Sequence, residues 1–433
     1  MCIKRVLLVI LTIVSLFLVV TPPAPLSAAG EAGNGSRGVN SGGPISGRFP
    51  ISVVSNAPTH TAETNPAVAH NSGSMNTYLV VWDQLNSDGS ASVVYGRLVY
   101  SNGTLDSRNR ISPDTGYNQY PDVAYNPTLD QHLVVYEVGG LGIYGQITTN
   151  TGVPVGPARS IVESVGSTYR QPAVVYSPTA GQYLVTWQRI QGTSMGIEAR
   201  TLSGDGTTLG SILEITTLLP VVQPAEPDVA YNSALDQCLV IWQQWSSVSD
   251  TTQHDIWSQR ISMTGGAHLE GSPIRVFDST DDEVNPAVGA LPVPGSAGGR
   301  YLVVAQQWYG GTTSYIDGWA VNGNSGDRAY HLAISPYAGY VPAVAGNEHT
   351  QEYLVAWTHD NFTLAGCTIS FEGAIDPAHY LSGVFLSRPA IASGRQGDYL
   401  VAYQDMFASG YPTDVFGWRW GNRVFLPLVL RRS

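Results

Sequence analysis

Short blocks in which every residue is apolar recur along the chain and dominate its hydrophobic pattern. The first such block within the body of the chain, YLVVW, spans residues 78–82. In an extended strand, side chains alternate between two faces, so Tyr78, Val80 and Trp82 point one way and Leu79 and Val81 point the other. A strand that is apolar on both faces must be covered on both sides. The blocks therefore predict short strands that are buried between other layers.

Each block belongs to a larger repeat that is marked by one proline. The block follows a segment such as PDVAY at residues 121–125, and a third segment such as IYGQ at residues 143–146 comes after it. A glycine turn and a fourth segment, often ending in Ile-Ser, complete the unit, which we interpret as four strands, A to D. Successive prolines lie 55, 51, 55, 59, 56 and 47 residues apart. The strand-A prolines are Pro66, Pro121, Pro172, Pro227, Pro286, Pro342 and Pro389.

Seven four-stranded units predict an all-β fold, a seven-bladed β-propeller, because each blade of a propeller is covered by its two neighbours. The seventh copy has no clear strand D, whereas residues 47–54 (GRFPISVV) look like a strand D that nothing precedes. We expect this N-terminal strand to complete the last blade and close the ring, so that no sheet edge is left open. An open solenoid is the alternative, but it would need polar capping repeats, and neither end supplies one.

The two ends of the chain differ from the repeat. Residues 1–29 combine a basic start at Lys4 and Arg5, an apolar run over residues 6–20 and small residues up to Ala29, which is the layout of a secretory signal peptide. The run is too short to span a bilayer, so no membrane span is expected after cleavage. Residues 30–45 are expected to form a flexible Gly/Ser-rich leader, and residues 46–421 the propeller. Residues 422–433 form an apolar and basic tail, either an extra strand or a sorting signal. The expected location is secreted or cell envelope, outside the cytoplasm.

Charge and cysteine content exclude several classes of partner. The formal net charge is −12, and removal of residues 1–29, which hold two basic and no acidic residues, changes it to 19 − 33 = −14. An acidic chain does not suit nucleic acid or anionic lipid. Three cysteines do not form a disulfide scaffold, and Cys238 and Cys367 are expected to be buried as small hydrophobic residues. We expect no cofactor, no metal and a monomeric chain.

The repeat resembles a group of uncharacterised secreted bacterial β-propeller repeat proteins. The resemblance rests on segments of the types PAVAYN, YLVVW and IYGQR, and it covers about residues 47–420. It implies the propeller fold and export from the cell. These motifs are structural, so the resemblance carries over no functional residue.

The best candidates for function lie on the propeller face that carries the B–C and D–A loops. The B–C loops differ between blades and include Trp245 and Trp308, which could be recognition residues or could pack locally. A polar residue ends strand B in every blade, which predicts a ring that either binds sugar hydroxyls or peptide, or satisfies loop backbone. The ring consists of Asp83, Glu137, Gln188, Gln243, Gln306, Thr358 and Gln404.

No catalytic motif is convincing. Residues 192–196 match G-x-S-x-G, but they lie between two strands, not at a strand-to-helix turn. No His/Cys spacing typical of a metal site occurs. The first hypothesis is an exported, non-catalytic binding or scaffold protein that recognises a polysaccharide or an extracytoplasmic protein through the B–C/D–A face. The alternatives are a carbohydrate-active enzyme, a glycoside hydrolase or lyase with Asp83 and Glu137 as its acid pair, and a structural cell-surface component.

Overall fold

The computed structural model describes residues 43–44, 46–52, 62–73, 75–247, 250–293, 298–310, 313–335, 338–360, 363–382, 388–406 and 413–421. All of them belong to one compact unit, residues 41–433. The predicted signal peptide, most of the predicted leader and the tail lie outside the described residues. Within the described ranges, no helix has the length and apolar character needed to cross a membrane.

Six antiparallel sheets contain four strands each, and each sheet is one copy of the repeat. Blade 1 contains β3 (Glu63–Asn71), β4 (Thr77–Leu85), β5 (Ser92–Tyr100) and β6 (Leu105–Arg110). Blade 2 contains β7 (Asn118–Asn126), β8 (Gln131–Val138), β9 (Gly142–Thr149) and β10 (Arg159–Glu163). Blade 3 contains β11 (Thr168–Ser177), β12 (Gln182–Gln191), β13 (Ser194–Ser203) and β14 (Leu209–Glu214).

The next three blades repeat this order of strands. Blade 4 contains β15 (Ala225–Asn232), β16 (Gln237–Ser247), β17 (Asp250–Ser262) and β18 (His268–Arg275). Blade 5 contains β19 (Asp282–Leu291), β20 (Arg300–Tyr309), β21 (Thr313–Asn322) and β22 (Arg328–Ala333). Blade 6 contains β23 (Gly339–Asn347), β24 (Glu352–His359), β25 (Thr363–Ser370) and β26 (His379–Ser382).

The seventh blade is built from both ends of the described chain. It contains β27 (Pro389–Ser393), a 3-10 turn η1 (Arg395–Gly397), β28 (Tyr399–Met406) and β29 (Thr413–Gly421), and two short N-terminal strands, β1 (Gly43–Pro44) and β2 (Phe49–Pro50), pair with β29. The backbone of Val415 accepts hydrogen bonds from the N–H groups of Ile51 and Ser52, at 2.8 and 3.1 Å. The predicted closure of the ring by the N-terminal strand is confirmed. The pairing begins at Gly43, inside the segment expected to be the leader.

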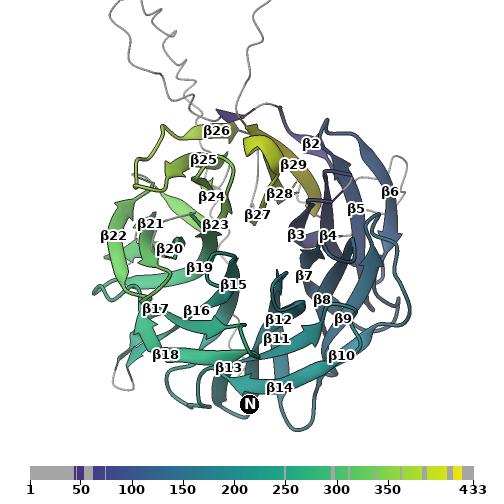
Figure 1. The fold of residues 1–433 in the computed structure, drawn as a ribbon, viewed down its shortest axis with the longest axis horizontal. Coiled ribbons are helices and arrows are strands. Elements are labelled where there is room, and N and C mark those ends of the chain that lie inside the picture. Colours follow the sequence, from purple (N-terminus) through teal and green to yellow (C-terminus); the bar gives the residue numbers. More distant parts are fainter. Residues whose placement is uncertain are drawn as a thin grey trace, which may run out of the picture. The chain divides into compact units, whose positions relative to one another are not determined.

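The blades form a closed ring around a central channel. The first strand of each blade contacts the first strand of the next, and β27 contacts β3, which joins the last blade to the first. These first strands line the channel, while the fourth strands form the outer rim (Figure 1). The predicted seven-bladed β-propeller is therefore confirmed.

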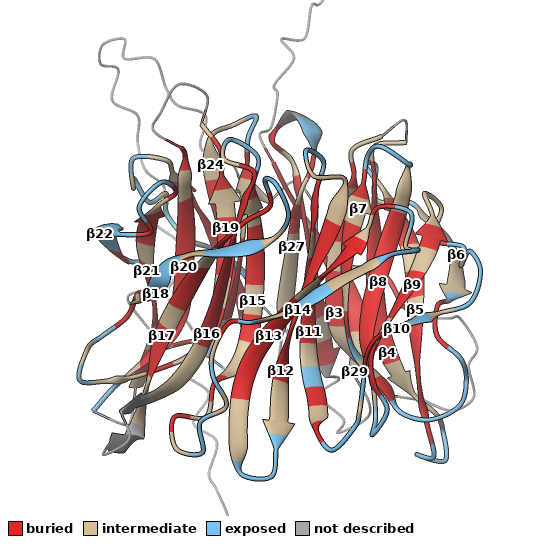
Figure 2. Ribbon diagram, turned by 60° about the horizontal axis from the view of Figure 1, so that its bottom comes forward, coloured by how far each residue is buried: buried red, intermediate tan, exposed pale blue. Residues whose placement is uncertain are grey.

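The core lies between the blades, as the two-faced strands require. On β4, Leu79 and Val81 pack against Val134 and Tyr136 of blade 2. On its other face, Trp82 packs with blade 7 side chains such as Leu400. Cys238 and Cys367 are buried and unbridged, as predicted. Buried residues follow the middle of the strands, and exposed residues gather in the loops at both ends of the ring (Figure 2).

Candidate ligand-binding site at the channel mouth

A backbone irregularity recurs where each innermost strand begins. In blades 1–6 the pairing between strands A and B skips at the marker proline, as between Thr64 and Ala67 in blade 1. The residue just before the proline has a positive φ in all six blades, an uncommon conformation for residues other than glycine. These residues and their φ values are Asn65 (50°), Tyr120 (50°), Gln171 (51°), Glu226 (52°), Asn285 (52°) and Val341 (45°).

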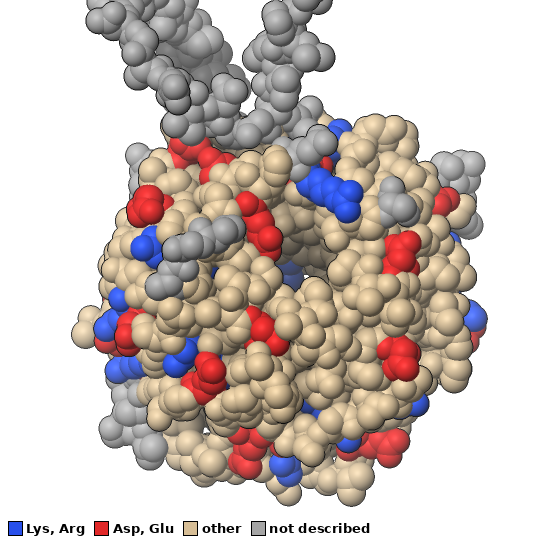
Figure 3. All heavy atoms as spheres, viewed as in Figure 1, with Lys and Arg blue, Asp and Glu red and all other residues tan. Residues whose placement is uncertain are grey.

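The six bulges and the equivalent position in blade 7 place seven pre-proline side chains around one opening. The residues before the prolines, together with the prolines and the next residues of strand A, line a cavity of about 480 Å³ at the end of the channel that carries the B–C and D–A loops. The channel is visible as a hollow at the centre of the ring (Figure 3). Apart from Val341, the pre-proline positions hold polar side chains. They are Asn65, Tyr120, Gln171, Glu226, Asn285 and Arg388.

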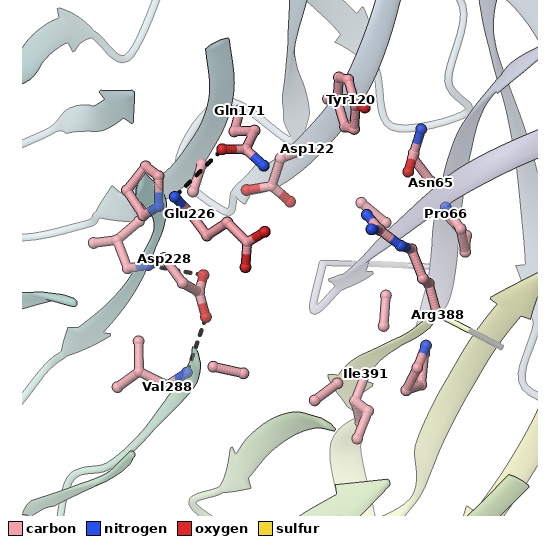
Figure 4. A pocket seen from close by; sticks show the side chains of 18 of the residues that line it. Asn65, Pro66, Tyr120, Asp122, Gln171, Glu226, Asp228, Val288, Arg388 and Ile391 are labelled. Carbon is pink, nitrogen blue, oxygen red and sulfur yellow. Dashed lines mark hydrogen bonds between the residues drawn. The ribbon is translucent and has the colours of Figure 1, made fainter. Parts of the chain in front are cut away.

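Glu226 and Arg388 supply charges of opposite sign from opposite sides of this mouth (Figure 4). Burial raises the pKa of the Glu226 carboxyl, and the positive charge of Arg388 opposes that rise. Arg388 is exposed, whereas Glu226 is half-buried. The mouth therefore presents a carboxyl, a guanidinium, amides and the partly exposed ring of Tyr120 to one small volume.

Two further carboxyl groups lie one residue past the proline, in blades 2 and 4. Asp122 accepts a hydrogen bond from the backbone N–H of Val174 in the next blade at 2.7 Å, and Asp228 accepts one from Val288 at 2.9 Å. Burial raises the pKa of Asp122 to about 7 and that of Asp228 to about 6. Each carboxyl therefore links two neighbouring strands of the channel wall.

The polar ring that was expected to end strand B lies one to four residues before the end of that strand, and it is not part of the lining of this cavity. Most of these side chains instead accept a hydrogen bond from the backbone N–H of the pre-proline residue in the following blade. Asp83 accepts from Tyr120, Gln243 from Asn285 and Gln404 from Asn65, at 3.2, 2.8 and 3.1 Å. Glu137 accepts from Gln171, and Gln306 accepts from Val341 at 3.4 Å. The ring thus holds five of the six bulges from the blade before each of them.

Blade 3 departs from this pattern. The amide of Gln188 donates to the carbonyl of Pro224 at 2.9 Å, and the N–H of Glu226 donates to the side chain of Gln171 at 3.3 Å. Thr358 is buried at the equivalent place in blade 6. For the ring residues whose hydrogen bonds are given above, the structure supports a role in satisfying backbone groups, which is one of the two roles expected from the sequence. Ligand binding by these residues stays a prediction.

The acid pair suggested for an enzyme is set aside on this geometry. Asp83 is 3% exposed, and its carboxylate accepts hydrogen bonds from Thr64 and Asn65 at 2.6 and 2.8 Å besides the one from Tyr120. Burial raises the pKa of Glu137, and the nearby charge of Asp83 adds to this rise. Neither residue is among the described residues that line the mouth. A catalytic carboxyl must reach the substrate, so the cavity at the channel mouth gives no support to this pair.

The two candidate tryptophans lie in strands and not in the B–C loops where they were expected, because strand B runs further than predicted: Trp245 belongs to β16 and Trp308 to β20. Trp245 stacks on His254 with ring centroids 3.9 Å apart, and His254 is hydrogen-bonded to Asp282 at 2.8 Å. Asp282 lies directly opposite Trp308 in the pairing of β19 with β20. Trp308 in turn contacts the edge of Tyr340. Both tryptophans are half-buried, so local packing accounts for part of each surface.

Sequence reasoning missed the pre-proline positions, which are the residues that line the mouth. The sequence did contain a signal for them: the proline is the same in all seven repeats, whereas the residue before it changes from one repeat to another. Among the described residues, no group of three or more His, Cys, Asp or Glu side chains is placed to hold a metal ion.

Comparison with known proteins supports the fold and goes no further. No known family model matches the chain, and no curated protein matches it in sequence. Among solved structures, that of the polysaccharide lyase Uly1 is 8% identical, with 86% of this chain and 92% of that chain covered and a TM-score of 0.52. The β-propeller domain of the Trilobed protease from Pyrococcus furiosus is 9% identical, with 86% and 99% covered and a TM-score of 0.47. AofleA from Arthrobotrys oligospora is 12% identical, with 77% and 95% covered and a TM-score of 0.43.

Proposed function

We propose that this chain is an exported binding protein that recognises a segment of a polysaccharide at the channel mouth on the B–C/D–A face. The observation that carries the proposal is the repeated bulge. It holds the backbone of six pre-proline residues at a positive φ, and their side chains line one cavity. Strained residues of this kind cluster at functional sites, where the surrounding structure over-determines them. A rigid ring with variable side chains at one repeated position is suited to recognition.

The chemistry of the mouth favours a ligand rich in hydroxyl groups. Amides such as those of Asn65 and Gln171 can both donate and accept hydrogen bonds, Glu226 accepts, and Arg388 donates. Tyr120 is 36% exposed and offers an aromatic face beside these groups. A sugar has hydroxyl groups that donate and accept, and apolar C–H faces that lie against aromatic rings. Uly1, which shares the fold at 8% identity, is a polysaccharide lyase, so a propeller of this kind is compatible with such a ligand.

Calorimetric titration of the mature chain, residues 30–433, with a panel of neutral and acidic oligosaccharides tests the proposal. Arg388→Ala and Tyr120→Ala should each weaken binding at the mouth at least tenfold. The matched controls, Arg110→Ala and Tyr380→Ala, replace exposed residues on outer strands and should leave affinity unchanged. If no member of the panel binds, or if binding survives both mouth variants, the proposal fails.

The exported location rests on residues 1–29 and has its own test. Expression in a host with a general secretory pathway, followed by N-terminal sequencing of the product, should give a chain that starts at residue 30. A chain that keeps residues 1–29 would count against export by cleavage of a signal peptide.

A second candidate, a carbohydrate-active enzyme, is favoured by one observation. Asp122, Glu226 and Asp228 all line the mouth, and burial raises the pKa of each. A general acid in glycoside cleavage must stay protonated near neutral pH, which raised pKa values permit. New reducing ends released from a bound polysaccharide, and lost in Glu226→Gln, would favour the enzyme. Binding without any product would favour the binding protein.

A further inference from the structure

The opposite end of the channel contains a second and larger cavity, of about 810 Å³. It lies where the innermost strands end, on the face that carries the A–B turns. The two cavities share Val175, Val288, Val344 and Ile391 in their linings. These aliphatic side chains lie where the two cavities meet. We call the first cavity, at the channel mouth described above, the upper mouth, and the second cavity the lower mouth.

One repeated position divides the lower mouth into two unlike halves. The fourth residue after the marker proline is aromatic in blades 1–4 and small in blades 5–7. The aromatic residues are His70, Tyr125, Tyr176 and Tyr231, and the small ones are Ala290, Gly346 and Ser393. Four consecutive rings therefore form a wall, and the three blades facing it leave space.

The rings of this wall are held in place by their outer ends. The hydroxyl of Tyr125 donates to Asp130 at 2.6 Å, and that of Tyr231 donates to Asp236 at 3.0 Å. Tyr176 packs against Tyr183 with ring centroids 4.8 Å apart. Because these side chains are already ordered, a ligand that packs on them does not have to immobilise them.

The spacious half has hydrogen-bonding groups at its rim. Glu348, His349 and Arg395 line it and are exposed, so their polar ends are accessible. Ser233 of blade 4 donates to Glu348 of blade 6 at 3.3 Å, which links the rims of two blades that are not adjacent. The cavity thus combines aromatic side chains from four blades with an acceptor and donors from two of the other three, the usual composition of a small-molecule site.

We propose that the lower mouth is a second carbohydrate-binding site, which takes one or two pyranose units with a C–H face against the tyrosine wall. A pyranose matches both halves, because its ring face is apolar and its edge carries hydroxyl groups that can donate to Glu348 and accept from Arg395. A purely apolar ligand would make no hydrogen bonds to these rim groups. The ligand class is shared with the proposed function, but the site rests on different residues.

Two sites at opposite ends of the channel would make the chain bivalent. The two mouths lie at opposite ends of the channel, so each mouth would engage a different polymer chain or a distant segment of the same one. Linked sites of this kind gain avidity for long polymers without any new contact. The protein would then cross-link polysaccharide chains, which a single site cannot do.

The stoichiometry of oligosaccharide binding, measured by calorimetry on residues 30–433, tests the inference. The intact chain should bind two molecules of a short oligosaccharide. Ser393→Phe fills the spacious half and leaves the tyrosine wall intact, and Tyr231→Ala removes part of the wall. Each should reduce the number of bound molecules from two to one, and Arg388→Ala should do the same through the upper mouth.

The outcomes separate this inference from the proposed function. One bound molecule that is lost in Arg388→Ala and kept in Ser393→Phe would overturn the second site and leave the proposed function standing. One bound molecule that is lost in Ser393→Phe alone would do the reverse. Two bound molecules that both remain in Ser393→Phe and in Tyr231→Ala would also overturn the inference, because the second site would then lie outside the lower mouth.

Discussion

Replacing Asp83 by alanine would remove the acceptor of three hydrogen bonds at once. The donors are the Thr64 hydroxyl, the Asn65 amide and the backbone N–H of Tyr120, at 2.6, 2.8 and 3.2 Å. Thr64 and Asn65 are half-buried and can turn toward water, whereas the N–H of Tyr120 is fixed by the bulge. Asparagine at this position keeps an oxygen for Asn65 and Tyr120, and its amide can donate to Thr64.

The two substitutions should therefore differ in their cost. A buried donor left without a partner costs about 1–3 kcal/mol, and the loss of two side-chain bonds adds to this. Burial raises the pKa of Asp83, which shows that the carboxylate itself is disfavoured there and offsets part of the loss. We expect Asp83→Ala to lower the free energy of unfolding by about 2–4 kcal/mol, and Asp83→Asn by less than about 1 kcal/mol. Glutamine already plays the equivalent role at positions 243, 306 and 404.

Urea unfolding followed by tryptophan fluorescence measures both values, with Asp114→Ala as the control for an exposed carboxylate. A loss under about 0.5 kcal/mol for Asp83→Ala would refute the reasoning, since that is the scatter of surface substitutions. Equal losses in the alanine and asparagine variants would also refute it, because the charge would then matter more than the hydrogen bonds. A tenfold loss of oligosaccharide affinity in Asp83→Asn, at unchanged stability, would assign Asp83 to ligand binding.

Three other predictions follow from the bulges, the ring closure and the buried acids. Val341→Asn should stabilise the fold by about 1 kcal/mol in urea unfolding, because asparagine tolerates a positive φ better than a β-branched residue; a loss of stability would contradict the strain argument. Arg48→Ala removes a 2.6 Å ion pair to the buried Asp405 at the ring closure, and it should lower the free energy of unfolding by about 1–3 kcal/mol. The control Arg110→Ala removes an exposed ion pair and should lower that free energy by under about 0.5 kcal/mol. Burial raises the pKa of Glu283 from 4.5 to about 8. Between pH 4.5 and about 8 the folded chain therefore holds a proton that the unfolded chain has released. The free energy of unfolding should fall as the pH rises through this range, by up to about 1.4 kcal/mol per pH unit. Urea midpoints from pH 5 to 8 should therefore decline in the parent chain and decline less in Glu283→Gln; parallel pH profiles for the two would exclude Glu283 as a cause.

The fold could be predicted because its signal is repeated seven times. One YLVVW block is ambiguous between a buried strand and a short piece of buried helix, but seven blocks at one period, each preceded by a proline, leave few alternatives. The surplus strand at residues 47–54 and the missing strand D of the last copy together predicted the closure. The repeat did not predict that pairing begins as early as Gly43, because the two-residue strand Gly43–Pro44 is too short to show an alternation of apolar and polar residues.

The mouth could not be predicted for a physical reason. A residue that precedes proline is normally pushed toward extended backbone, so nothing in the sequence announces a positive φ at Tyr120 or Glu226. In both cases the N–H donates to a side chain of the preceding blade, Asp83 for Tyr120 and Gln171 for Glu226, and these residues lie far from their donors in the chain. The polar ring was recognised as a feature, but the partner of Gln404 is Asn65, 339 residues away. Only the three-dimensional packing of blades reveals such a pair.

The pairing of Gly43 with Gly421 also decides how the ring would respond to a pulling force. Both residues lie at the same end of an antiparallel pair, so a load applied through the chain before Gly43 and after Gly421 would open β1 and β2 from β29 like a zipper, one hydrogen bond at a time. Peeling of this kind yields at low force, because the bonds break in turn and not together. If the two ends of the protein were attached to two different structures that move apart, the sheet of blade 7 would open before that of any other blade.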